Sequence, residues 1–183
     1  MTPRFRVAGL RACVAALLLA LPAAGVQAQP PELELKVKAA FLFNFARFVS
    51  WPARKLGDDG APLWLCVLEP DLFDGVLEEM VADKSVDGRP MAVRRSARVD
   101  DLRSCHIVFI GGRDSAALAA PLEALRGAGV LIVTEAERPL PGAAVRFLID
   151  EGRVRLEINT AATAREQLQV SSRLLSVAQV VRE

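Results

Sequence analysis

The chain has 183 residues, 52% of them hydrophobic, and its 23 basic and 22 acidic side chains leave a net charge of +1. This balance, with no basic stripe along the sequence, argues against a nucleic-acid-binding protein. A single histidine and three cysteines also provide few candidate ligands for a metal site.

The first 28 residues have the three parts of a secretory signal peptide. A start with three arginines precedes an apolar run over residues 12–24, which is too short to span a membrane. Small residues at Val26 and Ala28 predict cleavage after Ala28. Residues 29–183 would then be one exported, periplasmic domain, and losing three arginines would change its net charge to −2.

Residues 36–52 form the most distinctive stretch and hold four of the eight phenylalanines. Phe41, Phe45 and Phe48 recur at positions i, i+4 and i+7, which lie on one face of a helix. Apolar neighbours point elsewhere, so the predicted helix is buried on more than one side. Pro52 predicts its end, because proline disfavours helical geometry in the residue before it.

Strand-like and helix-like segments alternate through the middle of the chain, which predicts a mainly parallel sheet covered by helices on both faces. The predicted strands are residues 63–68, 90–95, 105–110 and 130–133. The predicted helices are 72–81, with Asp71 as its N-cap, and a second one that runs from Asp114 or Ser115 to Arg126.

The end of the chain alternates apolar and polar residues instead. Residues 145–149 and 154–158 flank a polar turn, which predicts an antiparallel hairpin at one sheet edge. A final helix is predicted from Thr160 or Thr163, since Thr163 and Glu166 have the spacing of a capping box. The predicted fold is a single-domain α/β three-layer sandwich with a C-terminal antiparallel hairpin.

The predicted final helix carries two stripes. One stripe is sufficient for docking on the sheet, and it consists of Val170, Leu174, Val177 and Val181. The second either covers more core or contacts a partner, and it consists of Leu168, Ser171, Ser172, Leu175 and Ala178.

Catalytic chemistry has few candidate residues. His106 directly follows Cys105, but neighbours on a strand point to opposite faces, so the two are not expected to act as a dyad. His106 is instead expected to be a structural histidine with satisfied hydrogen bonds. We therefore predict no catalytic residue, no metal ligand and no cofactor.

One ligand-binding motif remains, between the end of the strand at Ile110 and the start of the next helix. Gly111, Gly112, Arg113 and Ser115 provide free amides and a cation that could hold an anion at this sheet edge. The alternative is a tight strand–helix turn, which needs glycine for purely structural reasons.

Two cysteines remain after signal removal, Cys66 and Cys105. An even pair in an oxidising compartment predicts a disulfide, and two separately buried thiols are the alternative. A bridge closing a loop of roughly 40 residues would stabilise the fold by about 4 kcal/mol.

Three segments together resemble the YfiR family of periplasmic proteins. The first is residues 38–52, which run KAAFLFNFARFVSWP. The second is residues 105–110 with the strand around Cys66, and the third is residues 154–159 followed by 171–175. They are spread over most of the exported chain.

This resemblance implies a non-enzymatic regulator that represses an inner-membrane diguanylate cyclase. The repressor binds the periplasmic sensor domain of the cyclase and keeps cyclic-di-GMP synthesis low. An outer-membrane lipoprotein of the OmpA/Pal type can sequester it, and a homodimer is left open. Cys66 and Cys105 match one family disulfide, whereas a second cysteine pair is absent here, so a switch that needs two bridges is not expected.

We predict the partner-binding surface on the hairpin and the final helix, because the simplest core does not need these outward positions. The predicted contact residues are Glu157, Asn159, Leu168, Ser172 and Leu175. The alternative function is a periplasmic small-ligand sensor that acts on another membrane signalling partner through the edge at residues 111–115.

Overall fold

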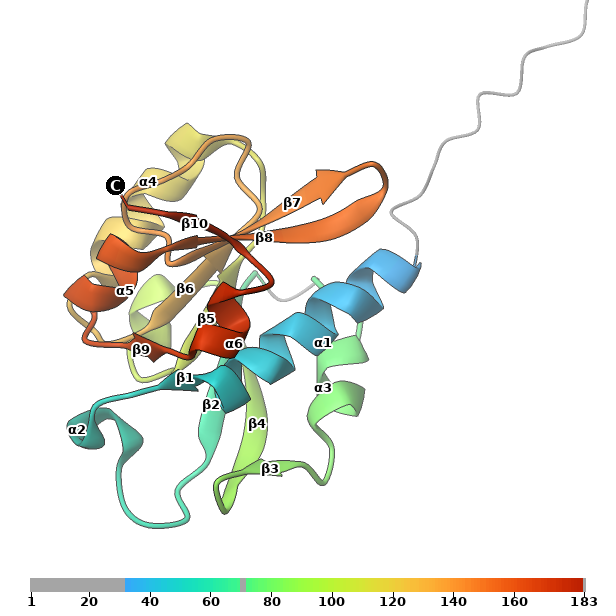
Figure 1. Cartoon of the computed structure of the whole chain (residues 1–183). Helices are drawn as coiled ribbons and strands as arrows, with labels where there is room; N and C mark the ends of the chain where they lie inside the picture. Colours follow the sequence, from blue (N-terminus) through green and yellow to red (C-terminus); the bar gives the residue numbers. More distant parts are fainter. Residues whose placement is uncertain (1–31, 70–71, 183) are drawn as a thin grey trace, which may run out of the picture.

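The computed structural model describes residues 32–69 and 72–182, so the predicted signal peptide, its cleavage site and the Asp71 cap lie outside the described residues. Figure 1 shows the elements, which in chain order are α1 (Glu32–Phe48), β1 (Val49–Ser50), α2 (Ala53–Leu56), β2 (Leu63–Leu68), α3 (Val76–Val81), β3 (Ser85–Val86), β4 (Arg89–Ser96), η1 (Val99–Leu102), β5 (Ile107–Ile110), α4 (Ser115–Leu125), β6 (Leu131–Thr134), β7 (Val145–Asp150), β8 (Arg153–Asn159), α5 (Thr160–Arg165), β9 (Gln169–Val170), α6 (Ser172–Leu175) and β10 (Gln179–Val181).

The main sheet has the strand order β10-β8-β7-β6-β5-β2-β4-β3. Strands β4, β2, β5, β6 and β7 run parallel, β8 returns antiparallel to β7, and β10 lies parallel to β8. A separate antiparallel pair joins β1 to β9. The predicted mainly parallel α/β sandwich is therefore confirmed.

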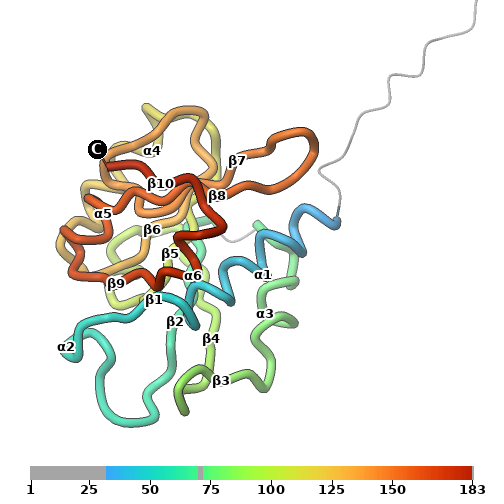
Figure 2. Tube along the Cα trace, in the orientation of Figure 1, coloured from blue at the N-terminus to red at the C-terminus, as the bar shows by residue number. Residues whose placement is uncertain are grey.

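The central strands are apolar throughout because they are buried on both faces. In β2, Leu65 and Val67 belong to the core under α1 and α3, which run close together in Figure 2. The intervening Cys66 belongs to the opposite core under α4 and η1. Each strand thus supplies alternate side chains to two cores, as a sandwich requires.

Helix α1 holds the most distinctive stretch of the sequence, as predicted. Leu42 and Phe45 are fully buried, and the ring of Phe45 stacks 6.2 Å from the ring of Phe147 on β7. The helix ends at Phe48, before Pro52, because the next two residues pair with β9.

The predicted helix over residues 72–81 begins later than expected, at Val76. Phe73 is buried and packs edge-on against Phe109, with ring centroids 5.0 Å apart. Its backbone has φ 72°, and Gly75 has φ 83°, so the chain turns here in the left-handed region instead of forming the first helical turn.

The predicted final helix starts at Thr160, one of its two predicted starts, but its predicted continuation to the end of the chain is wrong. Asn159 caps a helix of six residues, α5, and the later Gln167 has φ 59°, which breaks helical geometry. The chain then pairs with β1, forms the short helix α6, and pairs with β8 through β10. Valine and serine have modest helix propensities, so backbone pairing with available strand edges outweighs a helix here.

The predicted antiparallel hairpin is present as β7 and β8, but it is not at the sheet edge. Strand β10 covers the outer side of β8, with Val180 opposite Ile158. The predicted capping box is also wrong: α5 starts before Thr163, and Glu166 bonds to a distant turn.

The predicted disulfide is present between Cys66 and Cys105. Their Cα atoms lie 6.1 Å apart, and both residues are fully buried. The bridge ties β2 to the segment that leads into β5, inside the core beneath α4.

Candidate partner-binding and ligand-binding sites

Two of the residues predicted to contact a partner have buried structural contacts instead. The carboxylate of Glu157 accepts two hydrogen bonds from Arg146, at 2.9 Å each, and only 6% of the residue is exposed. Asn159 caps α5 by accepting from the amides of Ala161 and Ala162 at 3.0 and 3.1 Å. These residues therefore hold the hairpin and α5 in place.

The other three predicted contact residues do not form one exposed surface. Leu168 is 5% exposed and belongs to the core under α1. Leu175 is partly buried and packs against the same core, whereas Ser172 is exposed at the start of α6. Only the short helix α6 presents predicted contact positions to solvent.

The structure instead exposes apolar side chains at the hairpin tip and in the turn between α6 and β10. Ile149 is 48% exposed and Val177 is 68% exposed. Both line one open groove of about 850 Å³, which we call the hairpin groove; its lining residues are Leu148, Ile149, Asp150, Arg155, Leu156, Ser176, Val177, Ala178 and Gln179. Sequence reasoning missed it because Val177 was assigned to the inner stripe of a helix that does not form.

The predicted ligand edge at residues 111–115 is already occupied by protein groups. A Cβ atom on Gly111 would lie 2.4 Å from Cδ1 of Leu72, so this glycine is needed for close packing. The amide of Gly112 donates to Glu135 at 3.3 Å, and Arg113 lies 3.7 Å from Glu137. Because this amide and this cation already face carboxylates, they are poorly placed to hold an anion.

Ser115 is the fourth residue of the predicted ligand edge, and it offers no clear contact to a ligand. It begins α4, whose N-cap is Asp114, and its hydroxyl is buried with no hydrogen-bond partner among the described residues. The four residues of the predicted ligand edge are therefore neighbours in space, but their geometry favours the structural alternative.

A buried lysine that the sequence reasoning did not single out lies near this edge. Lys38 of α1 is paired with Glu34 at 2.6 Å and with Glu135 at 2.7 Å. Burial disfavours its charged form, but the hydrogen bonds to Glu135 and Glu34 outweigh that effect and raise the pKa of Lys38. It anchors the first turns of α1 to the end of β6.

His106 has the structural role expected of it. Its Nδ1 accepts from the amide of Trp64 at 3.0 Å, so the proton is on Nε2, which faces the carbonyl of Lys55 at 3.2 Å. Burial, with the nearby charge of Lys55, lowers the pKa of His106 to about 4. The imidazole is therefore neutral near pH 7 and fully used in hydrogen bonds.

Residues 32–69 and 72–182 contain no group of three or more histidine, cysteine or acidic side chains placed to hold a metal ion. Within the same residues, no helix is both long and apolar enough to cross a bilayer.

The model of the YfiR/HmsC-like family matches residues 35–179, which include most of α1, both cores, the hairpin and α6. The chain belongs to the YfiR/HmsC-like family. Members of this family are periplasmic regulators of cyclic-di-GMP signalling, and the family is regulatory rather than catalytic. No curated protein matches the chain.

Proposed function

We propose that this protein is a periplasmic repressor of an inner-membrane diguanylate cyclase. The observation that carries the proposal is the family match over residues 35–179, because this family acts with a membrane diguanylate cyclase. The repressor binds the periplasmic sensor domain of the cyclase and lowers cyclic-di-GMP synthesis in the cytoplasm.

Repression of this kind is a shift between two conformations of the membrane partner. The protein can bias that equilibrium only by the difference between its affinities for the two conformations. The contact surface must therefore be complementary to one conformation of the sensor domain, and no chemistry on a substrate is required.

We place the contact on the hairpin groove and the adjoining helix α6. Exposed Ile149 and Val177 supply apolar anchors, and Ser172 and Leu175 lie on the neighbouring helix. Glu157, Asn159 and Leu168 act indirectly, because they are buried and position these elements. Exposed apolar patches that are rimmed by polar groups are typical of protein-binding sites.

The first test compares intracellular cyclic-di-GMP in the parent strain and in a strain that lacks this protein. A clear rise on deletion is expected, and it should be reversed when the gene is restored. An unchanged cyclic-di-GMP level would contradict the proposed repression of a cyclase.

The second test introduces a charge into the hairpin groove with Val177→Asp. Because Val177 is 68% exposed, the variant should fold normally, but it should lose repression and raise cyclic-di-GMP toward the level of the deletion strain. Ala117→Asp adds the same charge at an exposed position of α4 and should repress like the wild type. Full repression by Val177→Asp would show that the hairpin groove is not part of the contact with the cyclase.

A further inference from the structure

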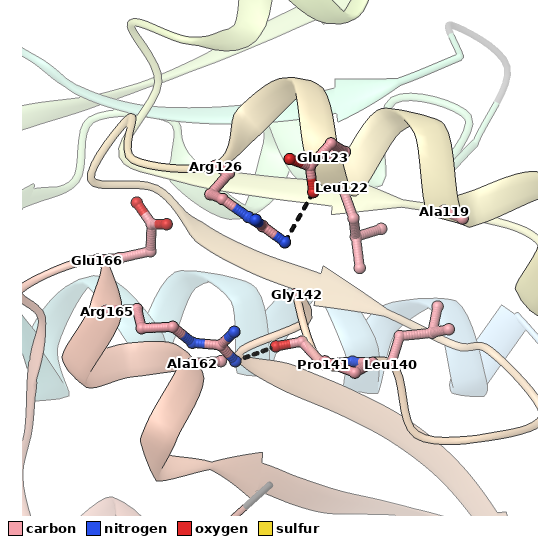
Figure 3. A pocket seen from close by; sticks show the side chains of 10 residues that line it. All are labelled: Ala119, Leu122, Glu123, Arg126, Leu140, Pro141, Gly142, Ala162, Arg165 and Glu166. Atoms are coloured by element: carbon pink, nitrogen blue, oxygen red, sulfur yellow. Dashed lines mark hydrogen bonds and ion pairs between the residues drawn. The ribbon is translucent and has the colours of Figure 1, made fainter.

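A second concave site lies between α4 and α5. This pocket has a volume of about 200 Å³, and we call it the α4–α5 pocket. Its lining residues are Ala119, Leu122, Glu123, Arg126, Leu140, Pro141, Gly142, Ala162, Arg165 and Glu166. Figure 3 shows Arg126 reaching into the pocket from α4 and Arg165 from the α5 side.

The floor of the pocket is apolar and closely packed. Leu122 and Ala162 are 6% and 3% exposed, and the loop at Leu140 and Pro141 forms one wall. A Cβ atom on Gly142 would lie 3.1 Å from Cδ2 of Leu122, so this glycine lets the loop close tightly against α4. An apolar cavity of about 150 Å³ accepts benzene, so this pocket is large enough for one ring.

The polar rim carries two arginines and two glutamates, so its formal charge is zero, but these four charges are not all paired with one another. Glu123 is paired with Arg126 at 2.7 Å, and Glu166 is satisfied by two backbone amides at 2.8 Å each. Arg165 differs, because it donates only to the carbonyls of Ala161 and Pro141 and forms no ion pair with a carboxylate in the described chain.

Those two carbonyls hold the Arg165 guanidinium in place at the pocket wall, as the dashed line to Pro141 in Figure 3 shows. A cation that is fixed before binding loses little side-chain entropy when an anion arrives. A guanidinium also matches the planar, two-oxygen geometry of a carboxylate.

We propose that the α4–α5 pocket binds a small monocarboxylate with an apolar body of about one ring. The carboxylate pairs with Arg165, and the apolar body lies on Leu122, Leu140 and Pro141. The site is independent of the proposed cyclase contact, because it is lined by different residues.

The test titrates the purified protein with sodium benzoate and follows backbone amide shifts by NMR. We expect saturable shifts confined to the pocket, with a Kd in about the millimolar range, as for a small ligand in an open site. Benzamide lacks the charge and acetate lacks the ring, so both should bind at least tenfold more weakly. Linear, non-saturating shifts, or equal binding of acetate, would overturn the proposal.

Variants separate the two parts of the site. Arg165→Gln removes the fixed cation, and Ala119→Phe fills the pocket from an exposed position on α4; each should weaken benzoate binding at least tenfold. Arg113→Gln removes an exposed cation outside the pocket and should bind like the wild type. Unchanged binding in Ala119→Phe would place benzoate elsewhere, even if Arg165→Gln had altered the local fold.

Discussion

Glu166 stabilises the turn that follows α4. Its carboxylate accepts from the amides of Gly127 and Gly129, which have φ 70° and 65°. Lys55 donates to the carbonyl of Ala128 in the same turn, and burial lowers its pKa to about 8. One turn between α4 and β6 is thus held by side chains from α2 and from the end of α5.

His106 makes the stability of the fold depend on pH. Its pKa is about 4 in the folded protein, below the ordinary value of 6.5, so the unfolded chain binds more protons between these values. His106 therefore contributes stability that is fully present above about pH 6.5 and is lost as the pH falls through about 4.

This titration can be followed directly, because the chain contains one histidine. In the tag-free protein, the imidazole resonances should stay at their neutral positions down to about pH 5. The free energy of unfolding, measured with urea, should be lower at pH 5 than at pH 7. This decrease should be smaller in His106→Gln than in the wild type. A histidine titrating near 6.5 would contradict the buried, neutral ring.

At the scale of elements, the disulfide ties two adjacent strands beneath α4. Because Cys66 and Cys105 are fully buried, a mild reductant should leave the bridge intact in the native protein and reduce it once urea unfolds the chain. We therefore expect the bridge to act as a structural constraint and not as a switch that solvent can reach.

The matching experiment replaces both cysteines by alanine. The bridge spans 39 positions, and chain-entropy arguments give a loss of about 4 kcal/mol in the free energy of unfolding. Urea unfolding curves of the double variant and the wild type provide the measurement. Equal midpoints would show that the bridge contributes nothing to stability.

At the scale of the whole molecule, the main sheet contributes side chains to a hydrophobic core on each of its faces. The two faces of the sheet should therefore unfold together. The chain has two tryptophans, and they report on different faces. Trp51 belongs to the core under α1, and Trp64 packs against the core that holds the disulfide. Loss of either core would leave apolar strand faces exposed, which favours a single cooperative transition.

Single-tryptophan variants test this cooperativity. In Trp51→Phe the fluorescence reports the disulfide side, and in Trp64→Phe it reports the α1 side. Within each variant, the urea midpoint from fluorescence should coincide with the midpoint from far-UV circular dichroism. Separated midpoints in one variant would identify a face that unfolds alone.

The sequence determined the central architecture by itself. Strands such as β2, β5 and β6 are short apolar runs, and their burial on both faces needs no information beyond that pattern. The helix from residue 36 to Phe48 and the pairing of Cys66 with Cys105 could likewise be predicted, because local periodicity and an even cysteine count specify them, whereas the first turn of α1 was not predicted.

Only the tertiary structure decided the conformation of the C-terminal segment and, with it, which residues form the candidate surfaces. The residues after Arg165 have a pattern that fits a helix, but the open edges of β1 and β8 offer backbone hydrogen bonds that a local pattern cannot reveal. Those long-range pairings expose Val177 and bury Glu157. The α4–α5 pocket likewise depends on Arg165 and Leu122 meeting across a fold that brings distant segments together.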